Sequence, residues 1–355
     1  QKLGTFLPKS GPKRMEPERL ERLENALKAI QQWENKLFEM DPIIIISKEL
    51  EEWGWKEHLK NLPYKKAPSG KVCQKGKEVF EARLQEFSEF LKTLRIAELE
   101  LEDGYIPEVH QPYFESFDWR NLNHEEWQVI PPTLVITDEE LFLEEEWPKF
   151  WEILKTGMPL RFMIHRLYPS PKNSNISESG DFLFRQDLTS IALGQRNVYL
   201  SQTTLANPVH LAKSLEEGLN RPLSSLFYIQ SFEESDMFMP PFLFLGSSME
   251  GRDFPLLRYD PEKGREWGSR FQIEENPSPG EDWPVYKIIV EQKEEKRELE
   301  LPFTFADFAV LEPAFQDQLY WLEENYVNEN LLSLHEFLGL SEEERRGKLP
   351  FVYGV

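Results

Sequence analysis

The chain is poor in cysteine, in cationic residues and in long apolar runs. Cys73 is the only cysteine among 355 residues, so this chain alone cannot build a disulfide framework, a cysteine-ligated zinc site or an iron–sulfur cluster. This composition fits a reducing cytoplasm best. No apolar run approaches the roughly 20 residues that a membrane-spanning helix needs. One of the longest, "IIII" at 43–46, has the length of a strand.

The charge balance is strongly acidic. The chain has 41 Lys and Arg against 63 Asp and Glu, a net charge of −22. Neutralising phosphate groups requires clustered Lys and Arg, so we expect no nucleic-acid partner and no attraction to an anionic membrane. The simplest interpretation of the excess is solubility, and the more specific one is an acidic face for a basic partner. Apolar residues make up 40% of the chain and aromatic residues 13%, which is enough for sizeable cores.

The common catalytic and metal-binding motifs are missing. The six histidines have no HExxH or comparable metal spacing, and no GxSxG sequence supports an acyl-transfer triad. "PSGK" (68–71) lacks the leading glycine and the trailing Ser or Thr of a P-loop. The acidic run 144–146 is interpreted as a solvated first helical turn. The sequence therefore assigns no catalytic residue and no metal ligand.

The first part of the chain, 1–112, is expected to be a helix-rich region. Apolar residues at helical spacing and charges on the opposite face predict amphipathic helices. They cover 16–40, 48–62 and 75–102. The stretch 62–71 is predicted to be a loop. We expect the short strand at 43–46 to pack with these helices.

The middle of the chain, 113–235, has the pattern of an α/β domain. Strand-like runs alternate with helical runs, which indicates βαβ units and a parallel sheet. The predicted strands are 132–137, 160–165, 197–202 and 225–230. The predicted helices are 144–157, 182–195 and 207–220. Gly157 is expected to end the first of these helices.

The last part, 236–355, is expected to be an irregular α+β extension. Alternating residues on both sides of a charged turn predict a hairpin at 283–305, followed by helices at 305–322 and 330–347. The apolar segment 237–245 is expected to be buried either within its own domain or against another. The chain begins with Gln1, and a strand-like run ends it at 349–355. We therefore expect a fragment of a longer protein or a processed product.

The α/β region resembles the thiamine-diphosphate-binding domain of pyruvate:ferredoxin oxidoreductases. The resemblance is carried by "DLTSIALGQRNVYLSQTTLANPVHLAKSLEEGLNRPLSSLFYIQSF" (187–232), which is similar to a helix–strand–helix–strand run of that family. A second match is "FPLLRYDPEKGREWGSRFQIEENP" (254–277), similar to the family's "PLYRYNP…FQLDSKEP" ending. The whole resemblance covers roughly residues 115–280, and it implies a parallel sheet of the thiamine-diphosphate-binding type.

The resemblance also implies where a cofactor would bind and how this chain departs from the family. The family's "GDG" motif, whose Asp binds the Mg²⁺ on the diphosphate, falls on Thr137-Asp138-Glu139. Its second, glycine-containing loop falls on 165–174, where its Thr maps to Arg166 and His165 ends the strand. The glycines are absent from both motifs, although backbone must approach phosphate closely there. Asp138, Arg166 and His165 are therefore expected to form a degenerate site, with Asp138 and Arg166 within ion-pair or water-bridged distance.

Three functions from different classes remain open. The first is a non-catalytic relative of 2-oxoacid:ferredoxin oxidoreductases, a scaffold or docking module for redox or iron–sulfur partners that needs no cofactor of its own. The second is an active fragment that binds thiamine diphosphate and Mg²⁺. The third is a small-anion-binding module that uses Arg166 and His165. The missing glycines favour the first of these functions. The cysteine that binds an iron–sulfur cluster in the family is also missing, and Ser231-Phe232-Glu233 stands at its position.

Overall fold

The computed structural model forms two compact units. It describes residues 15–36, 40–50, 59–168, 188–232, 239–277, 279–280, 283–292, 295–316, 319–323, 326 and 328–352. The first unit, here called the helical unit, comprises Gln1–Pro42 and Lys77–Pro131. The second, the sheet unit, comprises Ile43–Gly76 and Pro132–Val355.

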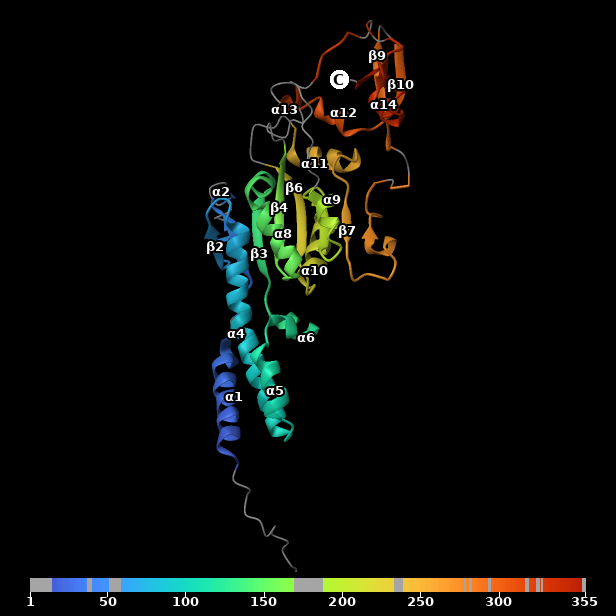
Figure 1. Ribbon diagram of the computed structural model, residues 1–355. Helices are drawn as coiled ribbons and strands as arrows, with labels where there is room; N and C mark the ends of the chain where they lie inside the picture. Colours follow the sequence, from blue (N-terminus) through green and yellow to red (C-terminus); the bar gives the residue numbers. More distant parts are fainter. Residues whose placement is uncertain are drawn as a thin grey trace, which may run out of the picture. The chain divides into compact units, whose positions relative to one another are not determined.

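The helical unit is built on two long helices, α1 (Pro17–Lys36) and α4 (Val72–Leu101). The first five residues of α4, 72–76, belong to the sheet unit. Trp33 of α1 stacks on Phe90 of α4 with ring centroids 4.9 Å apart and meets Phe87 edge-on at 5.7 Å. These aromatic contacts hold α1 and α4 side by side (Figure 1). The unit is completed by α5 (Pro107–Glu115), η2 (Trp119–Asn121) and α6 (His124–Val129). The amphipathic helices predicted at 16–40 and 75–102 are thus present over their described residues.

The sheet unit contains an eight-stranded sheet in the order β2-β1-β3-β4-β6-β5-β7-β8. The strands that the sequence predicted are β3 (Thr133–Asp138), β4 (Arg161–Tyr168), β5 (Tyr199–Thr204) and β6 (Ser225–Phe232). All of their pairings are parallel. The prediction of an α/β domain with a parallel sheet is therefore confirmed, and the antiparallel strands β7 (Leu257–Tyr259) and β8 (Phe271–Gln272) extend it at one edge.

Helices cover both faces of this sheet, as the alternation of elements requires. On one face, α8 (Trp147–Thr156) packs Phe150 edge-on against Phe162 of β4 at 4.9 Å. On the other face, α10 (Pro208–Leu219) packs against Phe227 and its neighbours on β5 and β6. Successive side chains of a strand point to opposite faces, so both faces of the central strands are buried. As predicted, α8 ends at Gly157, which adopts the left-handed conformation with φ 69°.

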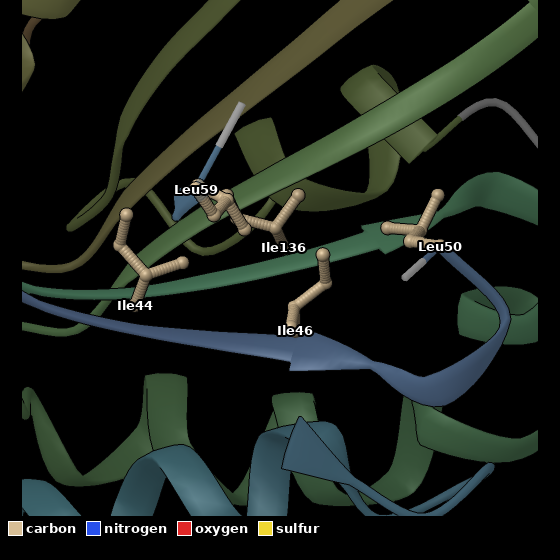
Figure 2. Close-up of a cluster of buried hydrophobic side chains, with 5 residues drawn as sticks. All are labelled: Ile44, Ile46, Leu50, Leu59 and Ile136. Carbon is tan, nitrogen blue, oxygen red and sulfur yellow. The ribbon is translucent and has the colours of Figure 1, made fainter. Parts of the chain in front are cut away.

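The strand β1 (Ile43–Ser47) lies inside the sheet, so its predicted packing with the N-terminal helices is wrong. It pairs in parallel with β3 on one side and with β2 (Tyr64–Ala67) on the other. A strand of isoleucines is apolar on both faces and suits the interior of a parallel sheet. One face packs with β3 in the cluster shown in Figure 2, which contains Ile44, Ile46, Leu50, Leu59 and Ile136.

The segment between β1 and α4 differs from the prediction in two ways. The predicted loop 62–71 contains the strand β2, which the sequence missed. The predicted helix 48–62 begins with the three-residue α2 (Lys48–Leu50), and residues 51–58 lie outside the described residues.

The C-terminal part contains the predicted hairpin, formed by β9 (Val285–Gln292) and β10 (Glu295–Pro302). The helix predicted at 305–322 is replaced by two shorter ones, α12 (Phe305–Ala309) and α13 (Pro313–Gln316). The helix α11 (Pro241–Glu250), which precedes the hairpin, was not predicted. A small parallel sheet pairs β11 (Leu331–Ser333) with β12 (Leu349–Phe351), and α14 (Leu334–Gly339) lies between them in the chain. None of the described helices has the length and apolar character needed to cross a membrane.

The apolar segment 237–245 is buried in part, within its own unit. Phe244 and Leu245 of α11 are fully buried and pack with Phe305 and Phe315. Phe242 is 60% exposed, and Leu243 is 53% exposed. Residues 237 and 238 lie outside the described residues. This segment therefore builds a core of its own while it leaves two apolar side chains uncovered.

Candidate functional site

The candidate site lies at the carboxyl ends of β3 and β4, where ligands bind in open α/β sheets. Asp138 is the last residue of β3 and the N-cap of the short helix α7 (Glu139–Leu141). Its Oδ1 accepts a hydrogen bond from the backbone N–H of Leu141 at 3.0 Å. Its Oδ2 is buried and has no hydrogen-bond partner in the described part of the chain. Burial raises the pKa of the Asp138 carboxyl, because its charged form loses hydration.

His165 is the register partner of Asp138 on the neighbouring strand. Register partners in a parallel pair point to the same face, so these two side chains are neighbours. The His165 ring is buried, and its Nδ1 lies 3.3 Å from the hydroxyl of Ser231 on β6. Burial lowers the pKa of His165 to about 4, so the ring is neutral at physiological pH. A neutral imidazole in this position offers no positive charge to an anion.

Arg166 points to the opposite face of the sheet from Asp138 and His165. Its Nη2 lies 3.6 Å from Oδ2 of Asp253, and its guanidinium lies 5.0 Å from the ring centroid of Phe254. The ion pair predicted between Asp138 and Arg166 is therefore absent. The physical reason is the length of β4, which continues to Tyr168, so that strand alternation directs Arg166 away from the face that Asp138 occupies.

Asp253, the partner of Arg166, is exposed and ends a chain of hydrogen bonds that begins at the buried Gln230. Its Oδ2 accepts the hydroxyl of Ser248 at 3.0 Å, and that hydroxyl accepts the side-chain amide of Gln230 at 2.8 Å. Gln230 is the register partner of Arg166 on β6. The guanidinium thus contacts two residues of the loop after α11, and Ser248 and Gln230 link its partner Asp253 to α11 and to β6.

Of the five acidic residues that follow β3, Glu139 and Glu146 are buried and the other three are exposed. Glu139 is buried and accepts a hydrogen bond from the hydroxyl of Tyr228 on β6. Glu146, the last residue of the π-helical turn η3 (Phe142–Glu146), is 1% exposed. The interpretation of 144–146 as a solvated turn holds for Glu144 and Glu145, which are exposed, and is wrong for Glu146.

The side chain of Glu146 lies against the N-terminus of α4. Its carboxylate accepts the backbone N–H of Val72 and, at 3.1 Å, that of Cys73. This strand–loop–helix corner, which contains "PSGK", has the geometry that binds anions elsewhere, and here an internal carboxylate fills the position of the anion. Gly70 adopts φ 66°, and a Cβ there would lie 2.0 Å from Oε2 of Glu145, so the loop also packs tightly. The pKa of the Cys73 thiol is raised, first by burial and then by Glu146.

The residues at these strand ends do not fit thiamine diphosphate with its metal. Asp138 caps its own helix through Oδ1, and that helix has only three residues. The described residues contain no group of three or more His, Cys, Asp and Glu that could hold a metal ion. The family's second loop falls largely on 169–174, which lies outside the described residues.

The sequence placed Asp138, Arg166 and His165 together at one edge of the sheet, and it missed the partners of the buried acidic residues that follow β3. Glu146 and Tyr228 form bonds with residues 74 and 89 positions away, and nothing local in their segments indicates this. Asp253 carried no signal either, because it lies in a stretch without regular periodicity.

Comparison of the chain with models of known protein families gives no match, and comparison with curated proteins gives none. The relation to the thiamine-diphosphate-binding domain therefore remains a hypothesis that rests on the similarity of residues 187–232 and 254–277.

Proposed function

We propose that the chain is a non-catalytic relative of the thiamine-diphosphate-binding domain of 2-oxoacid:ferredoxin oxidoreductases, acting as a scaffold or docking module in a larger redox or iron–sulfur assembly. One observation carries the proposal. The carboxyl ends of β3 and β4 are filled by groups of the same chain: Asp138 caps α7, Glu139 binds Tyr228, and Arg166 pairs with Asp253. A diphosphate and its metal would have to displace these contacts.

The active-enzyme alternative is less well supported. A diphosphate needs backbone N–H groups, glycines and a cation near one another. Here the residue that follows Asp138 is a buried acid, Glu139, and two like charges in a poorly hydrated place repel strongly.

The anion-binding alternative meets a different difficulty. Arg166 is already within 3.6 Å of a carboxylate, and His165 is neutral above a pKa of about 4. The two side chains also point to opposite faces of the sheet, so they cannot hold one small anion between them.

The expected partners follow from what the chain cannot supply. Its only cysteine, Cys73, is buried beside Glu146, so a cluster used by such an assembly would have to be bound by another domain or subunit. A reducing cytoplasm is part of this proposal, because free buried thiols and iron–sulfur partners belong to such a compartment.

Isothermal titration of the chain with thiamine diphosphate and Mg²⁺ tests the proposal directly. We expect no saturable heat, with an active thiamine-dependent enzyme titrated in parallel as the positive control. Titration with inorganic phosphate tests the anion-binding alternative under the same conditions. Saturable binding of thiamine diphosphate that needs Mg²⁺ and is lost in Asp138→Ala would overturn the proposal in favour of an enzyme.

A further inference from the structure

A stripe of apolar side chains on α1 is left uncovered. Here the α1 stripe denotes Leu20, Leu23, Leu27 and Ile30. Leu20, Leu27 and Ile30 are 46%, 57% and 45% exposed, and Leu23 is half-buried. Their spacing alternates three and four residues, which places them on one side of a helix over about 15 Å. Single exposed apolar residues are common, whereas a continuous stripe at this spacing marks a helix-binding surface.

The stripe is separate from the surface that α1 uses within its own unit. The side of α1 that faces α4 carries Ala26 and Trp33, which are buried, together with Arg19 and Arg22. Both arginines pair with Glu100 of α4. Since α4 already satisfies this side, the adjacent stripe is not required for the packing of the helical unit.

The charges around the stripe are acidic. Glu16 and Glu34 continue the same spacing beyond its two ends, and Glu24 lies beside it. All three are exposed and form no ion pair among the described residues. The cations of α1 are largely occupied elsewhere, because Arg19 and Arg22 bind Glu100 and Lys36 binds Glu86. The solvent-facing side of α1 therefore presents apolar side chains bracketed by carboxylates.

We propose that the α1 stripe binds an amphipathic helix of a partner protein that carries an apolar seam with Lys or Arg at its ends. Leucines at matching spacing would interdigitate with the stripe, and the basic residues would meet Glu16 and Glu34. This proposal deepens the proposed function, on which it rests, by naming the surface and the chemistry of a partner.

A second copy of this chain is a poorer occupant for the same surface. In an antiparallel pair of α1 helices, Glu16 of one copy would face Glu34 of the other. In a parallel pair, each of these residues would face its own counterpart. Both arrangements oppose like charges at both ends of the seam, which disfavours self-association.

Binding can be measured by fluorescence anisotropy with a labelled synthetic helix of about 20 residues. The probe peptide has leucines at the spacing of the stripe and lysines at both ends of the seam. One comparison peptide carries glutamates in place of the lysines, and another scrambles the probe so that composition is kept and the seam is lost. We expect the full chain to bind only the probe peptide, with an affinity that falls as salt is raised.

Two variants localise the binding. Leu27→Ser should weaken binding at least about tenfold, whereas Leu101→Ser, which alters a 72% exposed leucine at the end of α4, should leave it unchanged. The double variant Glu16→Lys, Glu34→Lys should lose the probe peptide and gain the glutamate peptide. That exchange of specificity cannot result from unfolding.

Several outcomes would overturn the proposal: failure of the chain to bind the probe peptide, equal binding of the scrambled peptide, or no effect of Leu27→Ser. Sedimentation that shows a dimer disrupted by Leu27→Ser would assign the stripe to a second copy instead. Thiamine diphosphate binding would refute the proposed function and leave the peptide result intact, so the two failures are distinguishable.

Discussion

Removal of the Glu146 carboxylate is the most informative test of the sheet unit. Glu146 is almost fully buried and accepts the backbone N–H groups of Val72 and Cys73 at the start of α4. The first N–H groups of a helix have no partner within the helix, so this side chain satisfies two of them from elsewhere in the chain. The substitutions Glu146→Gln and Glu146→Ala separate the charge from the hydrogen bonds.

The expected magnitudes follow from these two bonds. A hydrogen bond to a charged group contributes about 1.5–3 kcal/mol, and a negative charge at a helix N-terminus adds about 0.3–1 kcal/mol. Gln keeps one acceptor and loses the charge, so Glu146→Gln should lower the free energy of unfolding by about 2–3 kcal/mol. Ala leaves two buried N–H groups unsatisfied at about 1–3 kcal/mol each, so Glu146→Ala should cost about 3–5 kcal/mol.

Urea unfolding gives the global value, and amide hydrogen exchange at Val72 and Cys73 gives the local one. Glu144→Gln is the matched control, because Glu144 is exposed on the same turn and should change stability by less than about 0.5 kcal/mol. A Glu146→Ala variant within about 1 kcal/mol of the parent chain, with unchanged exchange at both amides, would refute the assignment of this carboxylate as the cap of α4.

Three further predictions concern the strands and their neighbours. Arg166→Ala should lower the free energy of unfolding by about 2–3 kcal/mol, and double-mutant cycles should couple it to Asp253→Asn by more than about 1 kcal/mol but to Asp138→Asn by less than about 0.5 kcal/mol. His165 has a folded-state pKa of about 4, below its unfolded value, so the unfolded state binds more protons and this residue's contribution to stability is lost as pH falls from about 6.5 towards 4. Between pH 7 and pH 5 the loss should be about 2 kcal/mol, and urea unfolding of His165→Gln should lack that part of the pH dependence. Gly218→Ala should cost about 1–3 kcal/mol in the same assay, because its Cβ would lie 2.6 Å from two buried aromatic rings of β5 and β6; an unchanged midpoint would show that α10 can shift away from the sheet.

The parallel sheet was predictable because its central strands have a clear sequence pattern. Apolar runs such as 132–137 and 225–230 alternate with helical segments, and that alternation has few topological solutions. The strand β2 was not predictable, because only Ala67 of its four residues is buried. Its stability comes from main-chain pairing with β1, which leaves no periodic trace in the side chains.

The boundaries of the strands decided how well the site could be predicted. Asp138 and His165 are register partners on adjacent strands, and both fall within the predicted strands or directly after them. Arg166 was assigned to a loop after 165, where its side chain could turn towards Asp138. The strand continues for three more residues, and one residue inside a strand reverses the face to which a side chain points. Element ends are the least certain part of a pattern-based assignment, and here the ion pair depended on one of them.

The acidic junction after β3 has its physical explanation in the same structure. Phosphate-binding junctions keep their N–H groups and cations free for a ligand. Here two buried carboxylates have internal partners instead: Glu146 binds the start of α4, and Glu139 binds Tyr228. Those carboxylates are removed from solvent, so they cannot account for an acidic surface. The carboxylates that remain available to a partner are exposed ones such as Glu16 and Glu34, beside uncovered leucines. Recognition by this chain is therefore expected where acidic and apolar side chains meet at its surface.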